Sequence, residues 1–330
     1  MTQAVLSDHI AAAHGDARAR ALKGFKLGDV AFHVLTKSSA IAVLLLLGGV
    51  IVSLVHGSAP ALGEFGFGFL TSQAWNPVTE KFGAGPAIYG TLVISFLALL
   101  IAAPMGFGIA VFLTELCPHV LRRPIGVAIE LLAGIPSIIY GIWGMFVLAP
   151  VLQTTLQPWL INGFADIPVL NDLFAGPPYG IGIFTASIIL AIMILPLIAS
   201  ISRDVFETVP PVLKEAAYGI GCTKWEVMRS IVAPYTGVGL VGGVMLALGR
   251  ALGETMAVTF VIGNAHKIHA SILGPGTTIS ATIANEFTEA DGAMYTSSLI
   301  ALGLVLFVIT FFVLAASRLL LARIKRQEGR

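Results

Sequence analysis

Six apolar stretches, each about as long as a helix that crosses a lipid bilayer, divide the chain into spans and loops. A membrane-spanning helix needs about 20 apolar residues to cross a hydrocarbon core of roughly 30 Å. The six stretches cover approximately residues 38–55, 89–113, 125–148, 180–201, 236–262 and 297–316. The sequence therefore predicts an all-α integral membrane protein with six transmembrane helices.

The composition excludes several classes of protein. Hydrophobic residues make up 56% of the 330 residues and charged residues 11%, whereas soluble domains carry roughly 25% charged residues. A soluble fold would have too little polar surface to cover itself, which excludes a soluble enzyme and a disordered chain. The net charge of +1 provides no basic field, so no nucleic-acid partner is expected. Cys117 and Cys222 are too few for a disulfide framework.

The distribution of Lys and Arg predicts the orientation in the membrane. If the N-terminus is cytoplasmic, 16 of the 19 Lys and Arg residues fall on the cytoplasmic side; Lys81 and Lys267 are external, and Arg250 lies inside a span. Cytoplasmic loops are enriched in these residues. Both termini are therefore expected in the cytoplasm, with residues 1–37 as an N-terminal extension, 38–322 as the transmembrane domain and 323–330 as a tail.

The cytoplasmic connection 203–235 has the pattern of two short amphipathic helices. The apolar side chains of the first recur with the spacing of one helix face; they are Leu213, Ala216, Ala217 and Ile220. The second opens on Thr223 and Glu226, a capping box. An ordinary solvated loop is the alternative. Two apolar faces outside the membrane favour a knob that docks on a partner.

Six residues of this connection resemble the EAA loop of the ABC-importer permeases. The motif runs Glu215, Ala216, Ala217, then Gly221, Ile231 and Pro234, with Ala233 where the family commonly has Leu. In that family the loop forms a coupling helix that inserts into a groove of a cytoplasmic ATPase. The resemblance implies the type I ABC importer (MetI-like) permease fold, with a core at about 89–318 and the coupling loop at 203–235.

Three further segments resemble the phosphate-specific (Pst) permeases within that family. They are residues 69–92, 134–141 and 249–258. The resemblance implies import of inorganic phosphate across the cytoplasmic membrane. It also implies a second, PstA-type permease subunit, two cytoplasmic ATPase subunits and an extracytoplasmic phosphate-binding protein. A permease for another oxyanion, such as sulfate or molybdate, is the nearest alternative.

Arg250 and Glu254 are the two charges inside the fifth span. A charged side chain well inside the bilayer core costs roughly 2.5–3.5 kcal/mol on insertion scales, and it usually faces a bundle interior or a water-filled path. One interpretation is a salt bridge between neighbours four residues apart, although Arg before Glu is the weaker order. The other is a substrate pathway, because a guanidinium offers a planar fork suited to phosphate. Glu254 would then moderate the attraction so that phosphate is released.

Pro136 predicts a kink in the third span, because proline removes a helical hydrogen bond and Ser137 can partner the freed carbonyl. Such a kink would help this span to move as part of a gate in the transport pathway. His266 and His269 lie beside the outer face, but two ligands without carboxylates or thiols make a weak metal site. We expect no metal and no cofactor.

The absent motifs exclude other classes of function. The chain has no G-x-x-x-x-G-K-[ST] phosphate loop, so ATP hydrolysis is expected in a partner subunit and not here. No hydrolase motif is visible, which argues against a membrane enzyme and predicts no catalytic residues. An ion-coupled secondary carrier remains a weaker alternative, since such a carrier needs no ATPase docking knob.

Overall fold

The computed structural model describes the backbone of residues 2–328 and the side chains of residues 28–323. Most of the predicted extension, 1–37, and almost all of the predicted tail, 323–330, lie outside the described side chains. The chain forms two compact units, residues 1–56 and 57–330. The first unit is the greater part of one helix, α1 (Thr2–Phe65), whose last residues belong to the second unit.

The second unit is built from long helices that short elements connect. The long helices after α1 are α3 (Gly85–Val111), α9 (Ile183–Glu207), α12 (Ala233–Leu252) and α15 (Ala293–Glu328). Shorter helices are α2 (Gly68–Thr71), α4 (His119–Ala133), α5 (Ser137–Trp143), α6 (Ala149–Val151), α7 (Gln157–Gly163), α8 (Pro168–Phe174), α10 (Pro211–Gly219), α11 (Lys224–Val227), α13 (Met256–Thr259) and α14 (Ile279–Glu286).

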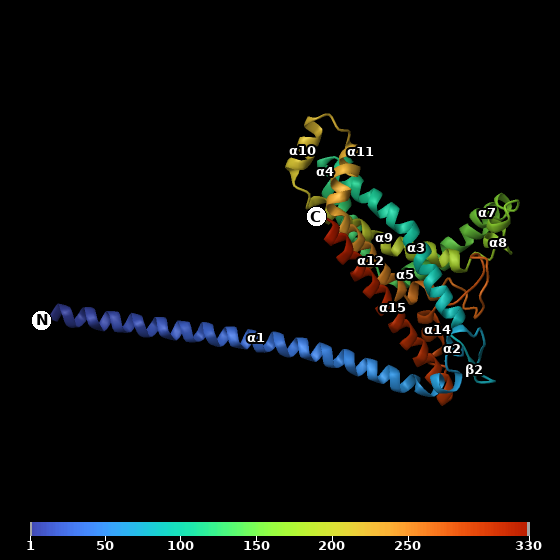
Figure 1. Cartoon of the computed structure of the whole chain (residues 1–330), viewed down its shortest axis with the longest axis horizontal. Helices are drawn as coiled ribbons and strands as arrows, with labels where there is room; N and C mark the ends of the chain where they lie inside the picture. The colour runs from blue at the N-terminus through green and yellow to red at the C-terminus, as the bar shows by residue number, and fades with distance from the viewer. Residues whose placement is uncertain (1, 329–330) are drawn as a thin grey trace. The chain divides into compact units, whose positions relative to one another are not determined.

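Four π-helical turns and one small hairpin complete the unit. The turns are η1 (Phe112–Leu116), η2 (Gly144–Leu148), η3 (Leu152–Leu156) and η4 (Met228–Val232). Strands β1 (Trp75–Asn76) and β2 (Lys81–Phe82) pair antiparallel, with Trp75 opposite Phe82. Figure 1 shows α10 and α11 at one end of the long helices, and α2, β2 and α14 at the other.

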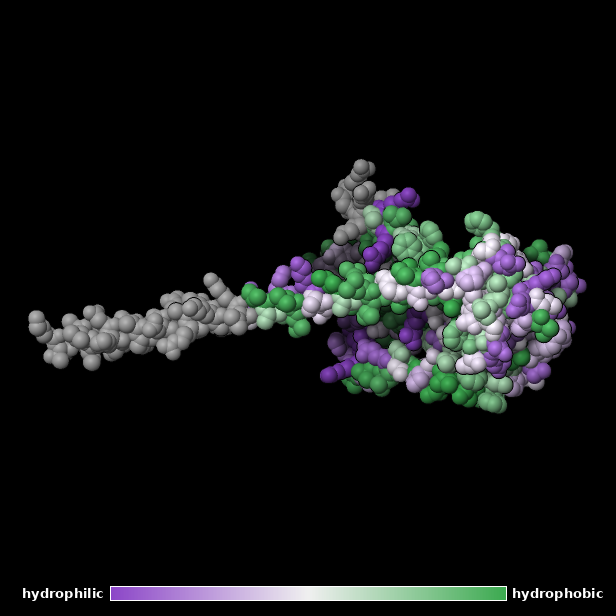
Figure 2. Space-filling view, turned by 90° about the horizontal axis from the view of Figure 1, so that it is seen from below, coloured by the Kyte–Doolittle hydropathy of each residue, from purple (hydrophilic) through white to green (hydrophobic). Residues whose placement is uncertain are grey.

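The prediction of six transmembrane helices is confirmed. Among the described residues, six helices are long and apolar enough to cross a membrane: Gly28–Phe65, Gly85–Leu116, Ser137–Gly163, Ile183–Glu207, Lys224–Leu252 and Ala293–Arg323. Apolar side chains also reach much of the surface in view of the second unit, as expected of helices that contact lipid (Figure 2). The predicted bounds of the third and fifth spans were wrong.

The third span is broken at Pro136. Helix α4 ends at Ala133 and α5 begins at Ser137, because Pro136 has no N–H to donate to the carbonyl of Leu132. The hydroxyl of Tyr140 donates to this carbonyl instead, at 2.9 Å. The expectation that Ser137 would supply this hydrogen bond was wrong, and the kink predicted at Pro136 is a full interruption of the helix.

The two pieces of this span run antiparallel to α9. Gly126 lies against the side chain of Arg203, near one end of α9, and Gly144 lies against Ile189, near the other. The helical path then continues through α6 and η3 to the end of α7 at Gly163. The external loop that was expected from residue 149 therefore begins later, and the apolar helix extends beyond the predicted end at residue 148.

The fifth span also stops early. Helix α12 ends at Leu252 and not near residue 262. Gly253 caps it, and α13 starts after a short turn at Met256. This interruption lets α13 pack closely on α5, because Gly141 has no side chain and lies against the backbone of Ala257. Glycine and short side chains allow such close approach of membrane helices.

Helix α9 lies at the centre of the largest apolar cluster. Ile189, Leu190 and Ile194 are fully buried there and pack with residues of α3 and α12. Ala98 and Ala102 of α3 belong to the same cluster. Small residues on α3 let the helices approach closely, so the core depends on shape more than on large side chains.

The contact between α3 and the segment before α14 gives a test of this close packing. A Cβ added to Gly90 would overlap the carbonyl oxygen of Thr277, which belongs to the backbone and has no rotamer through which to move aside. The hydroxyl of Thr91 also accepts a hydrogen bond from the backbone N–H of Ile279 at 3.0 Å. The variant Gly90→Ala should therefore lose roughly 1–3 kcal/mol of stability, the usual range for overpacking.

Thermal unfolding of the purified protein in detergent measures this loss. Gly108→Ala on the same helix is the matched control, because a Cβ there meets nothing within 4 Å. Equal melting temperatures for the two variants would contradict the assigned contact.

Candidate translocation site and docking surface

Arg250 lies near the middle of the membrane-spanning bundle. Helices α9 and α12 run antiparallel, with Gly239 against Val205 and Gly243 against Ile201. Arg250 follows Gly243 by seven residues, or about 10 Å along the helix. It is therefore opposite the centre of α9, which has 25 residues.

The salt bridge between Arg250 and Glu254 is not formed. Arg250 is exposed on this chain and has no carboxylate oxygen within 4.0 Å among residues 28–323. Glu254 lies beyond the end of α12 and accepts a hydrogen bond from the backbone N–H of Ala257 at 3.3 Å. Because the helix ends between them, the two residues are not neighbours on one helix face.

The structure brings Arg250 close to the break in the third span. Tyr140 donates its hydroxyl hydrogen to the carbonyl of Leu132 at 2.9 Å. It belongs to the same buried cluster as Ala247 and Ala251 of α12, which lie three residues before and one residue after Arg250. Sequence reasoning selected Arg250 and Pro136 separately and did not find Tyr140. An unpaired cation beside an interrupted helix can attract an anion and also respond to movement of the helix.

The predicted docking loop folds as two short helices. The hydroxyl of Thr223 accepts from the N–H of Glu226 at 3.3 Å, and the Glu226 carboxylate accepts from the N–H of Thr223 at 2.7 Å, so the capping box is confirmed. Helix α10 ends in a Schellman motif, in which the N–H groups of Gly221 and Cys222 bond back to carbonyls of the last turn. Gly221 has a φ of 90° there, which explains the glycine.

Most of the apolar face predicted on α10 points away from the protein. Ala217 is buried in a cluster with Phe206, Val227 and Met228, whereas Leu213 and Ala216 are exposed. Large exposed side chains dominate the surface of the two helices: Val212, Leu213, Ile220 and Trp225. We call these four residues the docking surface. Together they form an apolar surface at the end of the bundle that carries the cytoplasmic charges.

The remaining motif residues have different surroundings. Glu215 is exposed and makes no ion pair with any side chain that the structure describes. Ile231 packs against the cluster that holds Ala217. Pro234 is the second residue of α12, directly after the π-helical turn η4. Glu215 is therefore available to a partner, while Ile231 and Pro234 support the loop.

Glu286 is the centre of a polar cluster at the opposite, external end, and sequence reasoning missed it. Its carboxylate accepts hydrogen bonds from Trp75 Nε1 at 2.6 Å and from the Tyr295 hydroxyl at 2.7 Å, and it contacts His266 Nε2 at 2.9 Å. The rings of Trp75 and His266 stack with centroids 4.9 Å apart. These residues come from four separate segments, so no local spacing could have identified them.

The hydrogen bonds of this cluster stabilise the charged form of Glu286. Burial alone would raise the pKa of this carboxyl, but the hydrogen bonds from His266, Tyr295 and Trp75 outweigh burial and lower the pKa below its usual 4.5. Nε2 of His266 is therefore already engaged in a hydrogen bond with the carboxylate of Glu286. No group of three or more His, Cys, Asp or Glu among the side chains of residues 28–323 is arranged to hold a metal ion.

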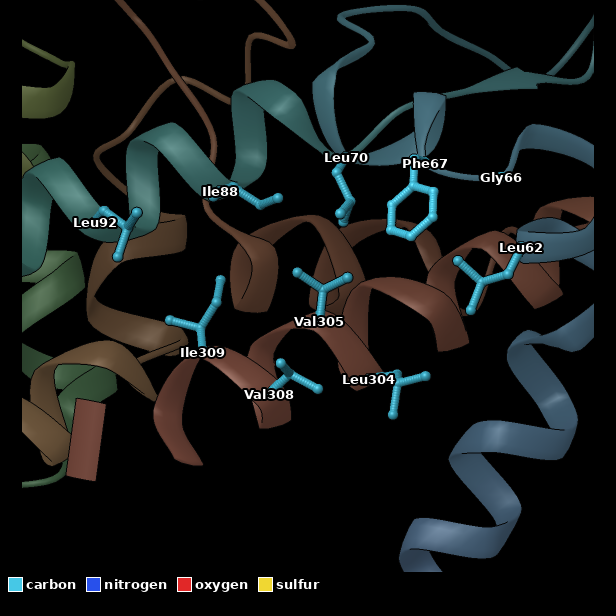
Figure 3. Close-up of a pocket in the computed structure, with 10 residues that line it drawn as sticks. All are labelled: Leu62, Gly66, Phe67, Leu70, Ile88, Leu92, Leu304, Val305, Val308 and Ile309. Carbon is cyan, nitrogen blue, oxygen red and sulfur yellow. The ribbon is translucent and has the colours of Figure 1, made fainter. Parts of the chain in front are cut away.

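An apolar pocket of about 530 Å³ opens between the end of α1, α2, α3 and α15. Figure 3 shows the side chains that face it, which include Leu62, Phe67 and Val305. None of the residues that line it carries a charge or a polar side chain. The pocket is thus unsuited to an anion, which leaves Arg250 as the better candidate for contact with a charged substrate.

Comparisons with known proteins agree with this geometry. A family model described as "Binding-protein-dependent transport system inner membrane component" matches residues 104–326. The phosphate transport system permease protein PstC of Mesorhizobium japonicum is 68% identical over 308 residues, which are 93% of this chain and 94% of that protein. PstC of Pasteurella multocida is 58% identical over 302 residues, or 92% and 94% of the two chains.

A solved structure shows the same fold at low sequence identity. A chain of the inward-facing MetNI methionine ABC transporter superposes with a TM-score of 0.53 at 17% identity. The match covers 72% of this chain and 94% of that one. The similarity concerns the arrangement of the helices only.

The external cluster gives a prediction with a defined pH dependence. The folded protein holds the pKa of Glu286 below 4.5, so the stabilisation is present above that pH and is lost as the pH falls through the lowered value. Glu286→Gln should remove about 1–3 kcal/mol at pH 7, the usual contribution of hydrogen bonds to a charged group. It should also remove that part of the acid dependence.

Melting temperatures in detergent between pH 3 and pH 7 measure both effects. Glu289→Gln is the control, because Glu289 is exposed and accepts no hydrogen bond from the described side chains. A Glu286→Gln variant as stable as the original protein at pH 7 would show that the cluster does not hold the external segments together.

Proposed function

The chain belongs to the family of binding-protein-dependent transport system inner membrane components, and we propose that it is the membrane permease of an ATP-driven phosphate importer. It is a multi-pass protein of the cytoplasmic membrane with the MetI-like fold of ABC importer permeases. The observation that carries the substrate is the extensive identity with phosphate transport permeases along almost the whole chain. The docking surface and the position of Arg250 agree with this function.

Three kinds of partner complete the importer. A second, PstA-type permease would cover the exposed side of this chain, one of two ATPase subunits would bind the docking surface, and an extracytoplasmic protein would deliver phosphate. Exposed apolar side chains such as Ile220 and Trp225 support the contact with an ATPase, because large apolar groups outside the membrane are usually covered. The exposure of Arg250 supports a pathway between two permeases, since a charge at mid-depth rarely faces lipid.

The transport cycle follows from these contacts. ATP binding closes the ATPase pair and draws the two docking loops together, which opens the pathway outward. Phosphate enters from its binding protein, and ATP hydrolysis in the partner subunits returns the permease to the inward-facing state. The ATPases supply the free energy, and this chain converts their movement into alternate exposure of the pathway.

Arg250 is the residue that meets phosphate in transit. Its guanidinium stays charged at any physiological pH and offers paired N–H donors to phosphate oxygens. Glu254 lies two residues beyond the end of α12, and its charge limits how tightly the anion is held. The interruption at Pro136 gives the wall of the pathway a hinge beside this cation, with Tyr140 as the hydrogen-bond donor that stabilises it.

Deletion of this chain tests the function directly. Cells that lack it should lose uptake of radiolabelled phosphate at sub-micromolar concentration, and excess unlabelled sulfate should not compete in cells that contain it. Uptake that persists after deletion would refute the phosphate assignment. Competition by sulfate would indicate a permease for another oxyanion, and uptake that follows the ion gradient while ATP is maintained would indicate a secondary carrier.

Replacement of Arg250 tests the pathway residue. Arg250→Gln should abolish uptake, a loss of more than about tenfold, because a neutral amide replaces a charge-assisted hydrogen bond. The complex should still assemble, since Arg250 makes no ion pair with the side chains of residues 28–323. Arg123→Gln, an exposed arginine of α4, is the matched control and should transport normally. Normal uptake by Arg250→Gln would refute its role.

A further inference from the structure

Glu115 joins the second membrane span to the docking loop. It lies in the π-helical turn η1, at the cytoplasmic end of α3. Its carboxylate accepts hydrogen bonds from Lys214 Nζ at 2.6 Å and from the Tyr218 hydroxyl at 3.3 Å. Its backbone carbonyl accepts a third from Lys224 Nζ at 3.0 Å. One residue of the span therefore holds both helices of the docking loop.

The contact is partly withdrawn from water. The side chain of Glu115 is 10% exposed and that of Lys214 is 19% exposed. Ion pairs on the open surface contribute little, but a pair in these surroundings is screened less by water and salt. The pKa of the Tyr218 hydroxyl is raised by burial and then by the charge of Glu115. The carboxylate thus acts on both residues of α10 that contact it.

The position of the contact leaves the docking surface free. Lys214 and Tyr218 are four residues apart on α10 and lie on the same side of the helix. Val212 and Ile220 remain 70% and 84% exposed. Helix α10 therefore has one side held by Glu115 and another available to an ATPase.

The turn around Glu115 is also linked to the third span. The guanidinium of Arg122 in α4 donates a hydrogen bond to the carbonyl of Thr114. Thr114 and Glu115 are among the last residues of the helix, whose carbonyls lack a helical donor. Cations suit this negative end of the helix dipole. The turn η1 is thus a junction between α3, α4 and both helices of the docking loop.

We propose that Glu115 is a positioning residue that transmits the movement of the docking loop to the second span. The proposal rests on the function proposed above. The loop is covalently continuous with α9 and with η4 and α12, and the only ion pair that ties it to α3 among residues 28–323 is the one between Lys214 and Glu115. A displacement of α10 by an ATPase therefore moves the end of α3 through this pair. Loss of the pair weakens this connection and leaves the hydrogen bond from Lys224 to the backbone carbonyl of Glu115 and the apolar contacts around Ala110 and Ala217.

The ratio of phosphate transported to ATP hydrolysed measures this role. We would reconstitute the complete importer in liposomes with its binding protein and compare Glu115→Gln, Glu115→Lys, Lys214→Glu and the double variant Glu115→Lys/Lys214→Glu. The single variants should lower the ratio roughly fivefold, the low end of the usual range for coupling between two sites. ATP hydrolysis should continue. The double variant, with the charges exchanged, should recover most of the ratio.

Glu130→Gln is the matched control. It removes another inter-helix ion pair, between Glu130 and Arg203 at 2.8 Å, which joins α4 to α9 and involves neither α10 nor α11. Its ratio should equal that of the original complex. An equal fall for Glu130→Gln would show that any cytoplasmic ion pair has this effect, and would overturn the proposal.

The remaining outcomes are also decisive. An unchanged ratio in Glu115→Gln overturns the proposal, and so does a double variant no better than the single ones. Co-purification of the ATPase subunits reports whether each variant assembles. If the single variants fail to assemble, restored assembly and coupling in the double variant support the proposal. A double variant that restores neither overturns it. Absence of phosphate uptake by the unmodified complex would instead refute the proposed function.

Discussion

The absence of water in the bilayer core is the constraint on which this structure depends. Every backbone N–H and C=O group there must find a partner within the protein. Continuous helices meet this requirement by themselves, and interruptions need help from a side chain. At Pro136 the carbonyl of Leu132 loses its helical donor, and it accepts hydrogen bonds from the N–H of Ile135 at 3.3 Å and from the hydroxyl of Tyr140 at 2.9 Å. The break is therefore tolerated in a particular geometry, and that geometry fixes the position of Tyr140.

The same requirement explains why the candidate site is where it is. Helix α12 ends at Leu252, just after Arg250, and the next short helix packs on α5 beyond the break. Two interrupted spans thus meet close to one unpaired cation. A charge at this depth needs water or protein around it, and an exposed position on the isolated chain is consistent with a path shared with a second permease. The site combines a cation that attracts an anion with helix ends that can change position.

The two ends of the bundle are organised by single acidic residues. Glu286 gathers Trp75, His266 and Tyr295 at the external end. At the cytoplasmic end Glu115 binds Lys214 and Tyr218 of the docking loop. Between them the helices pack through small residues, which transmit displacement because closely packed helices move as rigid bodies.

The sequence by itself determined the features that depend on local pattern. These are the number and direction of the spans, the two helices of the docking loop and the capping box at Thr223. Each follows from apolar periodicity, charge asymmetry or the chemistry of adjacent residues. The sequence also selected Arg250 and Pro136. Only the tertiary structure decided that Arg250 and Glu254 do not pair, that Tyr140 completes the break, and that Glu286 and Glu115 join distant segments. These contacts link residues from 8 to 211 positions apart in the chain, and packing, not spacing, brings them together.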